Sequence, residues 1–134
     1  MRPPGEPPPG GRLEVGDRPA GDQVIVVTVS GPLDLDTCPV LQAGLARALA
    51  ARRPPLVAID LSGLTSADSH GLAVLLAAER HARTAGGGLV VFGVGPLPRR
   101  IFRDRGLDRV LDIQPTPAEA VRRLERAGRD RSFE

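Results

Sequence analysis

The feature that most constrains this chain is the alternation of short apolar runs with segments of helical spacing. The runs at 23–30, 56–60 and 89–94 are nearly continuous and rich in Val, Ile and Leu, which is typical of strands buried on both faces. Shorter strands are expected at 110–113 and, at the sheet edge, at 13–15. Strands that alternate with helices in this way predict an α/β domain with a largely parallel central sheet.

Four helices are expected between and after these strands. The first begins near Asp36 or Thr37 and has a proline in its first turn. The second begins at Asp68 or Ser69 and ends near residue 85, where a run of glycines follows. A short basic helix at 98–105 and a last helix at 117–127 complete the pattern.

The length of 134 residues suits a single domain. Five prolines and two glycines fall within the first ten residues, so residues 1–21 are predicted to form a Pro/Gly-rich disordered tail. Residues 22–127 then form the folded domain, and 128–134 are expected to fray. No early apolar run resembles a secretory signal, and none is long enough to span a bilayer, so a cytoplasmic protein is expected.

Acidic and basic residues nearly balance, with 16 Asp and Glu against 18 Lys and Arg and a formal net charge of +2. The arginines near the C-terminus are interspersed with acids, and three Phe are the only residues of the Phe, Trp and Tyr class. A nucleic-acid surface normally combines a one-sided basic stripe with aromatic side chains. We therefore expect neither direct nucleic-acid binding nor membrane binding.

The residues that bind metals are too few, or too far apart, for a metal site. Cys38 is the single cysteine, which excludes an internal disulfide and a cysteine-based zinc site. We interpret it as a small apolar side chain, the alternative being a thiol whose pKa is lowered near a helix start. His70 and His81 are separated by about 16 Å along one helix and cannot share an ion. No cofactor is expected.

Polar side chains gather where two of the predicted strands end. Asp34 follows the first strand, Asp60 ends the second, and Asp68, Ser69 and His70 open the next helix. In an open α/β sheet, ligands and partners usually meet the carboxyl ends of the strands. Successive helical residues diverge by about 100°, so these last three cannot form a nucleophilic triad. We interpret Asp68 or Ser69 first as a helix cap.

Two leucines of the second helix lie beside its expected core face. On a helical wheel, Leu72 and Leu76 fall off the apolar stripe, on the side that carries Ser69. They either widen the buried face or form an apolar ridge beside a capping hydroxyl, which suits a docking surface. A phosphate added at this helix start would be favoured by the free N–H groups and would change the charge of that surface.

Three segments resemble the STAS domain family. Residues 31–37 (GPLDLDT) resemble the segment that leads into the family's first helix. Residues 57–64 (VAIDLSGL) and 68–75 (DSHGLAVL) are similar to its central strand and the start of its second helix. Residues 106–110 (GLDRV) look like a late family segment. The resemblance is closest to stand-alone anti-sigma factor antagonists.

The resemblance implies a STAS fold, with a central, mixed, mostly parallel sheet of four to five strands and about four helices. It implies an N-terminal strand added antiparallel. It also implies a protein that is not an enzyme, a monomer or weak homodimer that regulates transcription by partner switching. Such a protein binds an anti-sigma factor of the serine-kinase type and so frees a sigma factor. The kinase then phosphorylates the start of the second helix and breaks the complex.

The sequence departs from the family at the position that usually accepts the phosphate, which is His70 here. His70 implies an antagonist that the kinase cannot switch off. Alternatively, Ser69 accepts the phosphate, although its side chain points about 100° away. The third alternative is a domain that has left the switch and serves as a plain interaction module.

The expected partner-binding residues lie after the first strand and at the start of the second helix: Asp34, Asp68, Ser69, His70, Leu72 and Leu76. Two other functions remain open. One is a scaffold module of a signalling complex that never binds a sigma-controlling kinase. The other is a small α/β enzyme that uses Asp60, Ser69 or His70 on a nucleotide or acyl substrate. A deep pocket that joins these side chains would favour this alternative.

Overall fold

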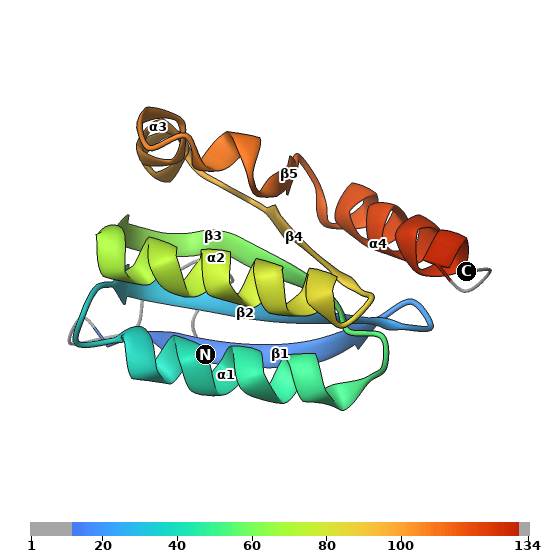
Figure 1. Ribbon diagram of the computed structural model, residues 1–134. Coiled ribbons are helices and arrows are strands. Elements are labelled where there is room, and N and C mark those ends of the chain that lie inside the picture. Colours follow the sequence, from blue (N-terminus) through green and yellow to red (C-terminus); the bar gives the residue numbers. More distant parts are fainter. Residues whose placement is uncertain (1–11, 132–134) are drawn as a thin grey trace.

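A five-stranded sheet forms the centre of the computed structural model, which describes residues 12–131 (Figure 1). The elements are β1 (Glu14–Ala20), β2 (Val24–Leu33), α1 (Cys38–Ala51), β3 (Leu56–Ala67), α2 (Ser69–Thr84), β4 (Gly88–Phe92), α3 (Pro96–Asp104), the short 3-10 helix η2 (Leu107–Arg109), β5 (Asp112–Gln114) and α4 (Pro117–Arg131).

The strands lie in the order β1-β2-β3-β4-β5. β1 pairs antiparallel with β2, and the three pairings that follow are parallel. In the middle of the sheet, Val27 lies opposite Ile59, which lies opposite Val91. The predicted mixed, mostly parallel sheet and its helices are confirmed.

The central strands are mainly apolar because helices cover both faces of the sheet. On one face, Val27, Ile59 and Val91 pack in a large core with residues of α1, α2 and α3. The alternate side chains point to the other face, where Val26 and Ala58 pack with residues of α4. Successive side chains of a central strand are therefore buried in two different cores, whereas in a sheet covered on one face every second side chain would face solvent.

The prediction that residues 1–21 form a tail is wrong for β1. Its seven residues pair with β2 from Glu14 opposite Ser30 to Ala20 opposite Val24. The segment is polar because it is an edge strand whose residues are mostly exposed. Backbone pairing holds it to the sheet, so the strand expected at 13–15 is longer than its apolar residues indicate. Residues 1–11 lie outside the described part of the chain.

Two element ends also differ from the sequence prediction. β3 continues to Ala67, where a loop from residue 61 was expected, because it pairs with β2 again after a shift in register. α4 continues to Arg131, so the expected fraying is wrong for residues 128–131. Gly128 is buried and packs closely on Leu56, which holds the last turns of α4 to the sheet. Residues 132–134 lie outside the described part.

Candidate functional site

The carboxyl ends of β2 and β3 meet the N-terminal ends of α1 and α2 at one rim, on the left in Figure 1. Residues 34–37 join β2 to α1, and Asp68 alone joins β3 to α2. The N–H of Asp68 donates to the carbonyl of Leu33 at 3.0 Å, which ties the two connections together. We call the surface formed by residues 34–40 and 68–70 the helix-start rim.

Asp34 and Thr37 close the turn that leads from β2 into α1. The Thr37 hydroxyl accepts from the N–H of Asp34 at 2.9 Å and donates to the carbonyl of Pro32 at 2.9 Å. Asp34 Oδ1 accepts in return from the N–H of Thr37 at 3.1 Å. Asp34, which the sequence predicts to contact a partner, therefore also has a structural role, because its carboxylate fixes the shape of this turn.

Asp68 caps α2, as its place before the helical spacing predicts. Its Oδ1 accepts from the N–H groups of His70 at 3.0 Å and Gly71 at 3.1 Å. These bonds use two of the N–H groups that a helix start leaves free. The bond from Gly71 is the main cause that lowers the pKa of Asp68, and the neighbouring His70 adds to the effect. A charged carboxylate therefore stands at the start of α2 at neutral pH.

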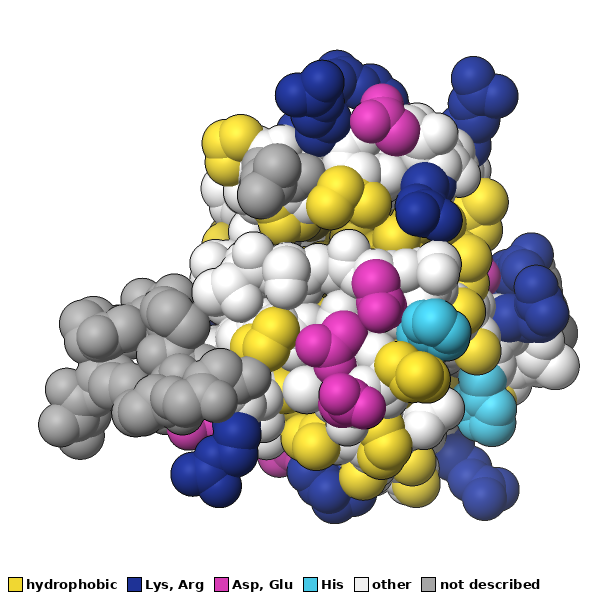
Figure 2. All heavy atoms as spheres, turned by 90° about the vertical axis from the view of Figure 1, so that its left-hand side faces the viewer, with side chains coloured by type: hydrophobic (Ala, Val, Ile, Leu, Met, Phe, Trp, Pro, Cys, Tyr) yellow, Lys and Arg dark blue, Asp and Glu magenta, His cyan; other side chains and the backbone are white. Residues whose placement is uncertain are grey.

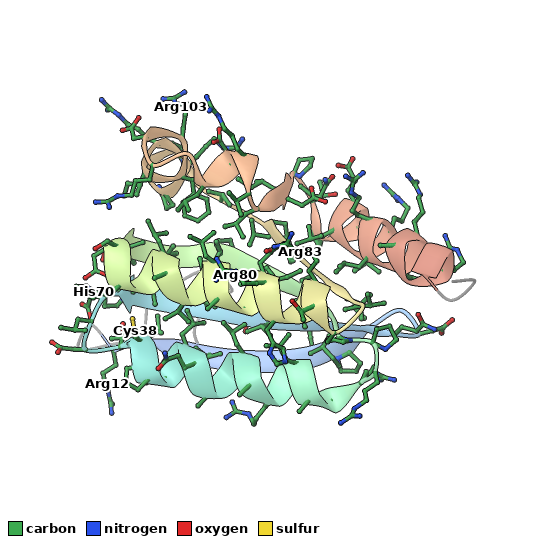
Figure 3. The ribbon with its side chains drawn as sticks, in the orientation of Figure 1. Arg12, Cys38, His70, Arg80, Arg83 and Arg103 are labelled. Carbon is green, nitrogen blue, oxygen red and sulfur yellow. The ribbon has the colours of Figure 1, made fainter. Side chains whose placement is uncertain are left out.

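Ser69 and His70 follow the cap and are both exposed. Figure 3 shows His70 at the outer end of α2, on the same side of the molecule as Cys38 at the start of α1. His70 Nδ1 lies 3.6 Å from Asp68 Oδ2, and the two side chains are 56% and 42% exposed. Water screens a pair this exposed, so it contributes little to stability. Both Ser69 and His70 are accessible from solvent.

Cys38, at the first position of α1, is 7% exposed. Burial raises the pKa of its thiol, and the nearby carboxylates of Asp68 and Asp34 raise it further. A raised pKa removes the alternative of an activated thiol at a helix start. Cys38 is a small buried side chain under the rim.

The structure corrects the expected docking role of Leu72. Leu72 is 3% exposed and belongs to the larger core, and the half-buried Leu76 packs against the same core. For Leu72, the wider buried face is the alternative observed, whereas Leu76 keeps part of its side chain exposed. Beside them, Gly71 lies directly over the side chain of Leu33, where an added Cβ would overlap it. Leu72 therefore leaves the set of candidate contact residues.

Two exposed hydrophobic residues on the rim were missed by the sequence reasoning. Leu35 is 61% exposed and Val40 is 44% exposed, and both lie among the residues that open α1. Figure 2 looks onto this side and shows hydrophobic side chains among acidic ones, with histidine beside them. The sequence does indicate that both side chains are exposed, because Leu35 lies between Asp34 and Asp36 and Val40 falls outside the apolar stripe of its helix. Exposed apolar side chains beside charges are typical of docking surfaces.

The two largest-volume hollows described among residues 12–131 do not join the residues of the enzyme alternative. Hollows of about 940 and 670 Å³ lie between α1 and α2 and beside β5, and neither is lined by Asp60, Ser69 or His70. Asp60 instead accepts a hydrogen bond from the N–H of Ser62 at 2.9 Å. Within residues 12–131, no three His, Cys, Asp or Glu side chains are grouped as metal ligands. In the same range, no helix has the length and apolar character needed to cross a membrane.

Comparison with known proteins assigns this chain and its fold to a family. Residues 17–114 match the family model described as "Mlab, STAS domain". An anti-sigma F factor antagonist from Paenibacillus polymyxa is 28% identical over 102 residues, which cover 76% of this chain and 87% of that protein.

Solved structures give the same result. An anti-sigma factor antagonist from Mycobacterium paratuberculosis superposes with a TM-score of 0.77 at 29% identity, covering 87% of this chain and 97% of that one. The anti-sigma factor antagonist SpoIIAA in its unphosphorylated form superposes with a TM-score of 0.69 at 20% identity, covering 84% and 96%. At 20% identity, the second likeness supports the fold alone.

Proposed function

This chain belongs to the STAS domain family, and from that premise we propose that it is a cytoplasmic anti-sigma factor antagonist. It binds an anti-sigma factor of the serine-kinase type and so frees a sigma factor for transcription. The observation that carries the proposal is the helix-start rim, where exposed Ser69 and His70 stand beside exposed Leu35 and Val40. Two relatives described above bear the name of anti-sigma factor antagonist and share 28% and 29% identity with this chain.

The composition of the rim supports binding to another protein. Its acids, Asp34, Asp36 and Asp68, suit a basic partner surface, and its exposed hydrophobic residues suit an apolar one. The proposed partner-binding residues are those predicted from the sequence except Leu72, with two exposed hydrophobic residues added: Asp34, Leu35, Val40, Asp68, Ser69, His70 and Leu76. We also propose that the chain acts as a monomer or weak homodimer.

His70 is proposed to make the complex insensitive to the kinase activity of its partner. The position that resembles the family's phosphoacceptor carries an imidazole next to Asp68 and has no hydroxyl. Kinases directed at a hydroxyl therefore find no acceptor at this position. Ser69 is exposed and remains the alternative acceptor, with its side chain turned about 100° away on the helix.

The test is a pull-down with the full chain from lysate of the source cell, with and without ATP, followed by intact-mass analysis of the bait. The expected result is an anti-sigma kinase retained in both conditions, with no mass increase on the bait. His70→Ser is expected to gain one phosphate with ATP and to release the kinase. Ser69→Ala is the matched control for the phosphorylation readout and should, like the wild type, gain no phosphate with ATP.

Three outcomes would contradict parts of the proposal. A phosphate on wild-type Ser69 with release of the kinase would show that the switch is intact and that the interpretation of His70 is wrong. A His70→Ser variant that binds the kinase yet gains no phosphate would show that the residue at position 70 is not the cause. Failure to retain any such kinase, with other signalling proteins bound instead, would favour the scaffold module.

A further inference from the structure

The far edge of the sheet carries a second exposed surface, formed around β5. β5 (Asp112–Gln114) is the last strand in the order, so among the described residues only β4 pairs with it. All three of its residues line a hollow of about 670 Å³. The same hollow is lined by Arg99 of α3, Arg109 of η2 and Arg123 of α4. We call this surface the β5 hollow.

The three arginines approach β5 from both faces of the sheet. α3 and η2 pack on the larger core through Phe102 and Leu107, whereas α4 packs on the opposite face through Ala120 and Leu124. Figure 1 shows β5 between η2 and α4. Successive side chains of a strand point to opposite faces. A strand added beside β5 would therefore direct its side chains alternately toward α3 and η2 and toward α4.

Charge around the β5 hollow favours an anionic occupant. Asp112 already accepts from Arg123 Nε at 2.8 Å and from Gln114 Nε2 at 2.7 Å, so its own charge is compensated. A neighbouring hollow contains Arg122 and Arg126, both exposed. α4 begins directly after β5, and the N-terminal end of a helix carries a partial positive charge.

We propose that the β5 hollow binds an extended, acidic segment of a partner protein, which adds a strand to the sheet beside β5. Carboxylates on alternate residues lie on one face of the added strand and meet Arg99 and Arg109, with the paired hydrogen bonds that guanidinium groups form with carboxylates, while Arg123 stays paired with Asp112. Val110 is 53% exposed and lines the same hollow, which gives the segment an apolar contact. This surface is separate from the helix-start rim, so the proposal does not rest on the proposed function.

Nucleic acid fits the β5 hollow less well. Asp108, whose position lies beside Arg109 in the lining, interrupts the basic surface and would repel a continuous phosphate backbone. The two phenylalanines among the described residues, Phe92 and Phe102, are buried and cannot stack on bases. A three-residue strand offers few backbone hydrogen bonds, so a peptide needs both pairing and charge to bind.

The test uses the full chain and a fluorescein-labelled peptide of alternating Glu and Val, followed by fluorescence anisotropy. We expect saturable binding that weakens as salt rises, because the contacting charges are exposed. Arg99→Gln combined with Arg109→Gln is expected to weaken binding about tenfold. The matched control, Arg47→Gln with Arg52→Gln, removes two exposed arginines outside the hollow and should leave binding unchanged. Circular dichroism checks that each variant is folded.

Two further probes separate strand addition from simple charge attraction. A peptide of the same sequence, N-methylated at every backbone nitrogen, keeps its carboxylates but has no N–H group to donate to an edge strand, so it should bind about tenfold more weakly. A peptide with Lys in place of Glu should not bind. In amide NMR spectra, the Glu-Val peptide should shift the resonances of Asp112, Ile113 and Gln114.

Several results would overturn the proposal. The proposal is wrong if the Glu-Val peptide does not bind. It is also wrong if the N-methylated peptide or a short DNA duplex binds as tightly as the unmodified Glu-Val peptide. Charges at a sheet edge also prevent copies of a protein from pairing with one another. If the peptide does not bind and the Arg99→Gln, Arg109→Gln variant dimerises on size-exclusion chromatography, the arginines only protect the edge.

Discussion

Gly71 determines how closely the start of α2 approaches the end of β2, and Gly71→Ala tests this packing. A methyl group at this position would overlap the side chain of Leu33, which is fully buried. Overpacking of a tight core costs about 1–3 kcal/mol. Replacing Gly by Ala inside a helix gains at most about 1 kcal/mol, and less in a first turn. We expect the free energy of unfolding to fall by about 1–2 kcal/mol, because the overlap outweighs the helix propensity.

Leu33→Ala provides the control that isolates this contact. Truncating a buried leucine costs about 2–5 kcal/mol by itself, and it leaves space for the methyl group that Gly71→Ala adds. In the Leu33→Ala background, Gly71→Ala is therefore expected to be neutral or stabilising. The two substitutions would then be coupled by about 1–3 kcal/mol. The measurement is urea unfolding followed by far-UV circular dichroism, since the chain contains no Trp or Tyr for fluorescence.

Two results would refute the reasoning. If Gly71→Ala destabilises the wild type and the Leu33→Ala variant equally, the overlap with Leu33 is not the cause of the loss. If it stabilises both, the helix propensity outweighs the overlap and α2 can shift without penalty. Ser69 and His70 directly precede Gly71, so a shift of α2 would also move the helix-start rim and should lower partner affinity.

Three further predictions concern the rim and the residues beneath it. Leu35→Asp and Val40→Asp should each weaken partner binding about tenfold in a titration without changing the melting temperature, whereas Val110→Asp, similarly exposed beside β5, should not. The backbone N–H groups that Asp68 caps lower the pKa of its carboxyl group in the folded protein. The carboxylate therefore stabilises the fold at pH values above the pKa that Asp68 has in the unfolded chain. This stabilisation is lost as the pH falls through the pKa of the folded protein. Asp68→Asn should therefore destabilise the protein at neutral pH and have less effect below about pH 4 in thermal melts. The Cys38 thiol, buried and with a raised pKa, should react with a thiol reagent at least about tenfold more slowly in the native protein than in denaturant.

The fold could be predicted from the sequence wherever an element buries its own side chains. The central strands show continuous apolar runs because each is covered on both faces, and α2 begins at a residue that caps it. β1 could not be predicted in full because the backbone of β2 holds it, and backbone pairing leaves no pattern in side chains. Pro19 and the exposed charges around it are tolerated because β1 is an edge strand.

The candidate site could be predicted in outline but not in its contact residues. Strand ends and helix caps placed Asp34, Asp68, Ser69 and His70 on one rim, because these signals are local. Leu72 was misassigned because the buried face of α2 is wider than the stripe of about 100° that its apolar residues indicate. The helix contacts α1 as well as β3 and β4, and Leu72 is covered as part of this wider face. Leu35 was missed because a single exposed leucine has no periodicity that would mark it.

The acidic character of the helix-start rim limits how a phosphate could act as an off switch there. Asp34, Asp36 and Asp68 already make the rim negative, so a basic partner surface is the complement. A phosphate adds about −1.5 to −2 charges, which by itself strengthens the attraction to such a partner. A phosphate can then release the partner only by a short-range effect. The bulky, hydrated phosphate must lie against a tightly packed or acidic part of the interface, where it clashes or is repelled. We infer that only a side chain directed into that contact can act as the switch. Position 70 faces Asp68, whereas Ser69 points about 100° away, so the loss of the hydroxyl at His70 would remove the switch even though an exposed serine remains beside it.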